Sequence, residues 1–156
     1  PDEAFLGGLF HDIGKQIMNY LDKAKFQEVM QHCFNEGVSF QAAERIVFDY
    51  SHEEVGALVI RKWNFPDHLM QAVLCHHSLD LPPEAEEDPY LVHLAHIVYL
   101  SNLFCHKFGI GTVNGEEEID ISATPSAQFL GLSGEKTDLL LEKFQAAFEK
   151  DKDFFS

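Results

Sequence analysis

The segment Leu9–Met18, LFHDIGKQIM, places a histidine and an aspartate next to each other inside an apolar stretch. Apolar residues around the pair recur at helical spacing, which predicts one helix from about Asp2 to Leu21 with one face mostly buried. These residues are Phe5, Leu6, Leu9, Phe10 and Ile13. Asp12 falls on or near that face, and a carboxylate is rarely buried without a partner. The pair His11–Asp12 therefore indicates a polar site within a helical protein.

The composition is that of a globular protein with a substantial core. The chain has 156 residues, of which 46% are hydrophobic and 24% are charged. We expect one domain over residues 1–156, and the start at Pro1 suggests a piece of a longer polypeptide. No apolar run approaches the roughly 20 residues of a membrane span, and no signal peptide is recognisable. Three scattered cysteines, Cys33, Cys75 and Cys105, predict reduced thiols in a cytoplasmic protein.

The net charge of −15 argues against binding to a nucleic-acid backbone, which requires clustered lysine and arginine. It does not exclude a small phosphorylated ligand such as a nucleotide, because bound metal ions can supply positive charge. We therefore expect neither a nucleic acid nor a membrane as partner.

Start and stop signals divide the rest of the chain into helices and two loops. Ser39 and Ser51 are predicted N-caps, Glu54 completes a capping box with Ser51, and Gly37 suits the end of a helix. The expected helices cover residues 23–35, 40–50, 52–63, 66–77, 90–108, 125–130 and 134–150, and the expected loops cover 79–89 and 109–120. We find no strand alternation, repeat or internal domain boundary. The predicted fold class is all-α.

Four histidines occupy positions that suit a metal site together with Asp12. His11 precedes the aspartate, His52 follows a helix cap, and His76–His77 end an amphipathic helix. Imidazole and carboxylate groups suit Fe, Mn, Zn or a similar divalent ion, and one aspartate can bridge two such ions. Lys15 lies one turn after His11, where it could meet a phosphate oxygen. Taken singly, each histidine is more simply explained as a core or surface residue than as a ligand.

The long helix carries two polar residues, Ser101 and Asn102, on its apolar stripe. Buried polar groups need hydrogen-bond partners, and a polar site nearby would provide them. We expect the remaining histidines to be surface or packing residues. They are His32, His68, His93, His96 and His106.

The order of these elements resembles the HDOD family, a branch of the HD-domain superfamily related to the HD-GYP phosphohydrolases. The matching segments are AFLGGLFHDIGK (4–15), Glu44, YSHEEVGALVIRKWNFP (50–66), CHH (75–77), IVYLSNLFCHKFGIG (97–111) and FLGLS (129–133). The resemblance extends over essentially the whole chain and implies an HD-domain-like helical bundle. It also implies that the N-terminal helices of the domain precede Pro1.

The resemblance further implies a set of functional residues. The metal ligands would be His11, Asp12, His52, His76, His77 and Asn102, with Asp12 as the bridge, and the catalytic residues of an active enzyme would be Asp12 and Lys15. The bound ion would be Fe, Mn, Mg or Zn. Two features depart from the fullest metal pattern of the HD superfamily: Asn102 stands where that pattern has an aspartate, and no histidine precedes His11. The segment after His77 lacks the glycine-tyrosine-proline signature of the HD-GYP phosphodiesterases.

Three functions remain open at this stage. The first is a regulatory or output module of bacterial signal transduction, which holds a divalent metal in a degenerate HD site and acts on other signalling domains or proteins. The second is a metal-dependent phosphohydrolase that acts on a nucleotide or another phosphoester. The third is a purely structural helical domain, in which Asp12 would find protein partners among His11, His52 and Asn102.

Overall fold

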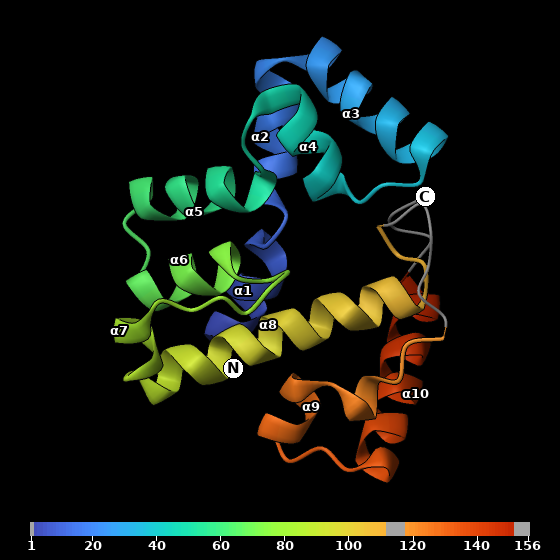
Figure 1. Ribbon diagram of the computed structural model, residues 1–156. Coiled ribbons are helices and arrows are strands. Elements are labelled where there is room, and N and C mark those ends of the chain that lie inside the picture. Colours follow the sequence, from blue (N-terminus) through green and yellow to red (C-terminus); the bar gives the residue numbers. More distant parts are fainter. Residues whose placement is uncertain (1, 112–117, 152–156) are drawn as a thin grey trace. The chain divides into compact units, whose positions relative to one another are not determined.

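The computed structural model of the chain describes residues 2–111 and 118–151. Within these ranges every regular element is a helix, which confirms the all-α class (Figure 1). The elements are α1 (Asp2–Phe10), α2 (Ile13–Leu21), α3 (Lys23–Glu36), α4 (Phe40–Phe48), α5 (His52–Lys62), α6 (Asp67–Leu74), α7 (Pro83–Glu86), α8 (Pro89–Lys107), the 3-10 helix η1 (Ile121–Ala123), α9 (Pro125–Phe129) and α10 (Gly134–Asp151).

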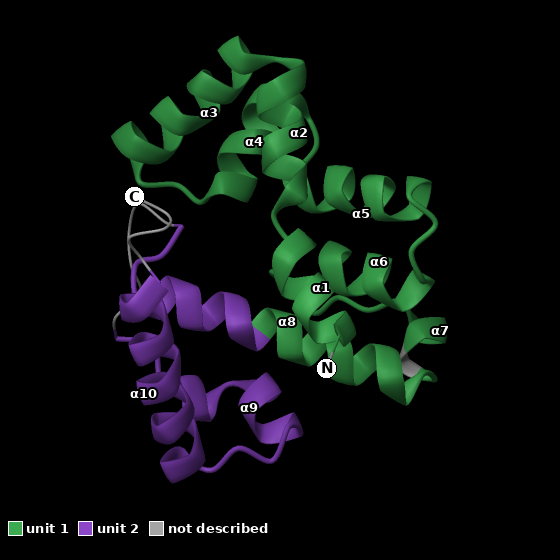
Figure 2. Cartoon of the chain, turned by 180° about the vertical axis from the view of Figure 1, so that it is seen from behind, with its two compact units in different colours: residues 1–99 green, residues 100–156 purple. Residues whose placement is uncertain are grey.

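The chain forms two compact units, residues 1–99 and 100–156, and the division falls within α8 (Figure 2). The assignment of residues 1–156 to a single HDOD domain stays a prediction. None of the helices in the described part of the chain is long and apolar enough to cross a membrane.

The expected single helix to Leu21 is wrong, because the chain turns at His11–Asp12 and separates α1 from α2. In a continuous helix the carbonyl of Gly8 would accept the main-chain N–H of Asp12. Here the Nδ1 atom of His11 lies 2.7 Å from that carbonyl oxygen instead. A side chain that bonds to its own helix in this way competes with the helical ladder. Asp12 is therefore the N-cap residue of α2, with a non-helical φ of −100° and ψ of 8°.

The expected burial of Phe5 and Leu9 is also wrong, because their side chains are 69% and 59% exposed. Helix α1 instead packs Ala4, Leu6 and Phe10 against the core, with the buried Gly7 among them. A Cβ atom on Gly7 would lie 2.6 Å from a methyl group of Val98, so the missing side chain lets α1 approach α8 closely. Leu6 and Phe10 pack beside this contact.

Two apolar clusters hold the first unit together. One joins α5, α6 and the first half of α8 with α1 packed against it, and the other joins α2, α3 and α4. The fully buried members are Ile60, Leu69, Ala72, Val73, Leu94 and Val98 in the first cluster, and Met18, Val29, Cys33, Ala43 and Phe48 in the second. Helix α5 packs against both α2 and α6 and so connects the two clusters (Figure 1).

The predicted caps are confirmed. Gly37 ends α3 in the left-handed conformation with a φ of 67°, and the Ser39 hydroxyl accepts the N–H of Ala42 at the start of α4. The Glu54 carboxylate reaches back to the N–H of Ser51 at 2.8 Å, as a capping box requires. These local interactions fix where α4 and α5 begin.

Two expected boundaries need correction. Helix α6 ends at Leu74, so His76 and His77 lie in the turn that follows it and not on the helix. The predicted loop 79–89 contains the short helix α7, which begins with Pro83 in its first turn, where the missing N–H of proline causes no loss.

The second unit consists of the end of α8 with η1, α9 and α10. The Phe144 ring on α10 packs edge-on against Phe104 and stacks on Phe108, with ring centroids 5.8 and 5.6 Å apart. The expected helices at 125–130 and 134–150 are confirmed as α9 and α10. Of the predicted loop 109–120, residues 112–117 lie outside the described part of the chain.

Candidate metal centre

Three separate turns of the first unit bring Asp12, His52, His76 and His77 together. Asp12 precedes α2, His52 is the first residue of α5, and the histidine pair follows α6. One potential ligand atom from each of the four residues lies within 4.8 Å of the other three. All four were predicted from the sequence as metal ligands.

The separations between these atoms are those of groups that face a common centre. The Nε2 atom of His52 lies 3.0 Å from Nε2 of His77, 3.4 Å from Nε2 of His76 and 3.3 Å from Oδ1 of Asp12. The distance from Asp12 Oδ1 to His76 Nε2 is 3.7 Å. Ligands of one tetrahedral ion bound at about 2.1 Å are roughly 3.4 Å apart.

Hydrogen bonds on the far side of the rings turn the Nε2 lone pairs toward this centre. His76 Nδ1 lies 2.6 Å from the Val73 carbonyl oxygen, and His52 Nδ1 lies 2.7 Å from Glu44 Oε2. A carbonyl can only accept, so Nδ1 of His76 carries a proton, and the lone pair of a neutral ring is then on Nε2. Metal-binding histidines are held by such bonds.

The buried Oδ1 atom of Asp12 has no hydrogen-bond partner. It faces Nε2 of His52 and His76, and in neutral rings that carry the proton on Nδ1 these atoms are also acceptors, which repel the carboxylate oxygen. A divalent cation removes the repulsion and satisfies all of them, and nitrogen and carboxylate ligands suit Fe, Mn or Zn. The residues present therefore fit a divalent ion.

The electrostatics of the cluster favour positive charge at its centre, which a metal ion or a proton on His52 can supply. Burial and the neighbouring His76 and His52 lower the pKa of His77 to about 2, so this imidazole is neutral. Burial alone would raise the pKa of Asp12, but His52, His76 and Lys15 hold it well below its usual range. Burial lowers the pKa of His52, yet the Asp12 and Glu44 carboxylates outweigh it and raise the pKa overall.

The other oxygen of Asp12 faces a different pair of residues. The Lys15 ammonium lies 2.8 Å from Oδ2, and Nε2 of His11 lies 3.5 Å from the same atom. Lys15 also lies over the Phe40 ring, 4.8 Å from its centroid. Burial lowers the pKa of His11, which favours the neutral ring. His11, predicted as a ligand, is thus not among the four groups that converge, and it borders the centre with Lys15 on the side of Oδ2.

The last predicted ligand, Asn102, lies on α8 in the second unit and is buried. Its assignment to the metal centre stays a prediction.

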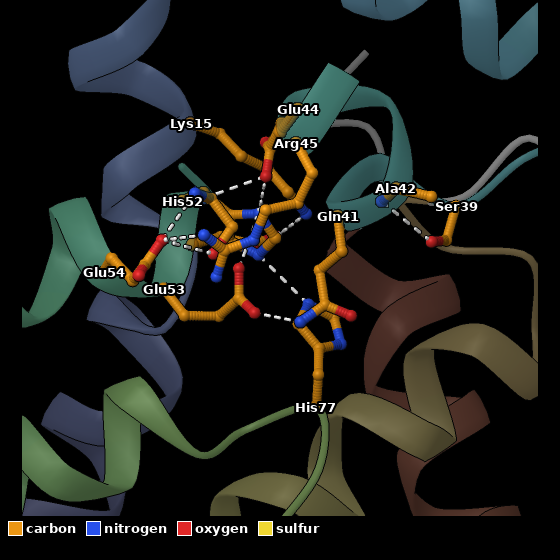
Figure 3. A network of polar contacts seen from close by, with 12 residues as sticks. Lys15, Ser39, Gln41, Ala42, Glu44, Arg45, His52, Glu53, Glu54 and His77 are labelled. Carbon is orange, nitrogen blue, oxygen red and sulfur yellow. Dashed lines mark hydrogen bonds and ion pairs between the residues drawn. The ribbon is translucent and has the colours of Figure 1, made fainter. Parts of the chain in front are cut away.

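Sequence analysis assigned no role to Glu44, Glu53 and Gln41, which surround the outer side of His52 (Figure 3). Glu44 accepts both N–H groups of His52, and Glu53 accepts from the Gln41 amide. A signal for Glu44 is present in the sequence: it lies four residues before the buried Phe48 and next to the buried Ala43 on one helix. That is the same anomaly, a carboxylate among core residues, that singled out Asp12.

Comparison with known proteins places this arrangement in a family. A sequence model of the HDOD domain matches residues 1–79. The chain belongs to the HDOD family. The crystal structure of an HDOD domain protein with unknown function from Geobacter sulfurreducens has the same fold, with a TM-score of 0.69 and 21% sequence identity over 95% of this chain.

This HDOD chain spans less than half of the length of two proteins that it matches. The chain covers 49% of the Geobacter protein. An uncharacterized protein of Treponema pallidum (strain Nichols) is 22% identical over 82 residues, which are 53% of this chain and 16% of that protein. The family assignment made from the HDIGK segment and its companions is confirmed by the sequence model, and the Geobacter structure establishes the fold.

Proposed function

We propose that this HDOD chain is a regulatory module of a signalling protein and that it holds one divalent metal ion through Asp12, His52, His76 and His77. The observation that supports the ion is the buried, unpartnered Oδ1 of Asp12 among imidazole nitrogens. The ion would be Fe, Mn, Mg or Zn, and the nitrogen-rich ligand set favours the first two or Zn over Mg.

A single ion is favoured because the second oxygen of Asp12 already has a cationic partner. Bridging two ions would require Oδ2, which pairs with the Lys15 ammonium at 2.8 Å. The ligand set that a two-ion phosphohydrolase needs is also reduced by the neutral amide at Asn102. Both features favour a regulatory role over hydrolysis, and the partners would be other domains or proteins of the same signalling system.

A metal-dependent phosphohydrolase is the second candidate, and the position of Lys15 favours it. A bound divalent ion polarises phosphoryl oxygens and lowers the pKa of a coordinated water molecule. Lys15 lies beside the candidate centre with its side chain 17% exposed, where its charge could stabilise a phosphoryl group.

Metal content is the first test. Untagged protein, purified without chelators, is analysed by elemental mass spectrometry beside Asp12→Asn and the control Asp67→Asn, which changes an exposed carboxylate on α6. We expect about one equivalent of Fe, Mn or Zn per chain in the wild type and in the control, and none in Asp12→Asn. Protein that neither contains nor takes up these metals would refute the proposed centre.

Turnover distinguishes the two candidate functions. The metal-loaded protein is assayed with nucleotides, cyclic dinucleotides and a generic phosphoester, with Asp12→Asn as the blank. No Asp12-dependent hydrolysis is expected for a regulatory module. Sustained hydrolysis that disappears in Asp12→Asn would replace the regulatory role with the enzymatic one.

A further inference from the structure

Glu44 on α4 is a fully buried carboxylate whose contacts are directed at one residue. Its Oε2 atom lies 2.9 Å from the main-chain nitrogen of His52 and 2.7 Å from Nδ1 of the same residue. Glu44 and His52 both have 0% of their surface exposed. One carboxylate oxygen therefore holds both the backbone and the ring of His52.

This contact determines which ring nitrogen of His52 can bind a metal. A neutral imidazole has one N–H and one lone pair, and the acceptor beside Nδ1 keeps the proton there. The lone pair is then on Nε2, the atom that faces Asp12, His76 and His77. A charged acceptor also makes the imidazole a stronger donor to a metal than a carbonyl acceptor does.

We propose that Glu44 is a positioning residue of the metal centre, which fixes the tautomer and orientation of His52 and increases its affinity for the ion. The inference rests on the proposed metal centre and extends it to α4. The Val73 carbonyl performs the orienting part of this role for His76, at 2.6 Å from Nδ1, but without a charge.

The chain contains a matched control in Glu53. This second carboxylate is also buried, and its Oε2 lies 3.3 Å from Nδ1 of His52, but it makes no hydrogen bond to that atom. Its Oε1 instead accepts from the Gln41 amide. Figure 3 shows both carboxylates beside His52, Glu44 from α4 and Glu53 from α5. Removing either one removes the same buried charge, but only Glu44 holds the imidazole.

The test is a Co²⁺ titration of metal-free protein, followed by the visible absorption of the bound ion. Glu44→Gln should weaken Co²⁺ binding about 10- to 100-fold and shift the absorption bands, as loss of an outer carboxylate does at histidine sites. In Glu53→Gln the loss of Co²⁺ affinity should be several-fold smaller than in Glu44→Gln, and the absorption bands should stay in place. Equal losses in the two variants would show that only net charge matters and would overturn the proposal, as would wild-type affinity in Glu44→Gln.

A second measurement needs no metal and no variant. Long-range ¹H–¹⁵N spectra of the metal-free wild-type protein, recorded at a pH at which the His52 ring is neutral, report its tautomer, and we expect the proton on Nδ1. A proton on Nε2 would overturn the role of Glu44 directly. Failure of the wild type to bind Co²⁺ would instead refute the proposed centre, and the tautomer would still decide whether Glu44 controls His52.

Discussion

Replacement of Gly14 by alanine tests how closely α2 must approach the metal centre. A Cβ atom at this position would lie 2.0 Å from the carbonyl oxygen of His52, 2.7 Å from its carbonyl carbon and 2.9 Å from its Cα atom. All three are main-chain atoms, so rotation of a side chain cannot relieve the clash. Ordinary contact begins at 3.4 Å, so α2 and the start of α5 must separate by about 1.4 Å, the difference between 3.4 and 2.0 Å.

The expected magnitude follows from two opposing effects. Overpacking of a core costs about 1–3 kcal/mol and sometimes more, and backbone clashes belong at the upper end. Alanine stabilises a helix by about 1 kcal/mol relative to glycine. We expect Gly14→Ala to lower the free energy of unfolding by about 2 kcal/mol or more, a large part of the roughly 5–15 kcal/mol of a typical domain.

Gly8→Ala is the matched control. Gly8 is exposed on α1, nothing lies within 4 Å of its Cβ position, and its carbonyl still accepts from His11 after substitution. Urea denaturation followed by circular dichroism should show Gly14→Ala destabilised and Gly8→Ala unchanged or up to about 1 kcal/mol more stable. Co²⁺ affinity should fall in Gly14→Ala alone, because Asp12 and His52 lie on the two segments that separate. Equal stability and affinity of the two variants would refute this account of α2 and α5.

Two further predictions concern the metal and the cap of α5. A divalent ion at 100 times its Kd should raise the free energy of unfolding by about 2.7 kcal/mol, because it binds only the folded chain. Thermal denaturation should show that His76→Ala loses this gain and that His32→Ala keeps it. A gain in both variants would place the ion elsewhere. Glu54→Ala should cost about 1 kcal/mol at neutral pH, because the Ser51 N–H loses its acceptor. Although burial raises it, the Ser51 N–H and Arg45 hold the pKa of Glu54 below its usual value. The ionised group therefore adds stability above the unfolded pKa and loses it as the pH falls through the folded pKa. Urea denaturation from neutral to acidic pH should show a weaker acid dependence in Glu54→Ala, and an unchanged dependence would contradict this.

Interactions within a few residues were predictable from the sequence. The capping box of Ser51 and Glu54, the cap at Ser39 and the left-handed Gly37 are all present, because each joins groups within one helical turn. The helical period likewise predicted α8 and α10 and the all-α class. The HDIGK segment and its companions further indicated the HDOD family, and the family match over residues 1–79 confirms it.

Only the tertiary structure decided which faces and which carboxylates are buried. Phe5 and Leu9 follow the helical period but are exposed, because the packing of α1 depends on the missing side chain of Gly7 against Val98, far along the chain. The break at His11 was hidden because both halves continue one apolar pattern.

At the metal centre, too, the sequence predicted one part and the tertiary structure decided the other. The sequence supplied the identities of Asp12, His52, His76 and His77, since their residue types and order carry the chemistry. It did not supply the partner of His52, because Glu44 meets it only through the turn that joins α4 to the start of α5. The outer contacts that orient a ligand depend on distances between segments, and those distances are determined by packing and not by the order of residues.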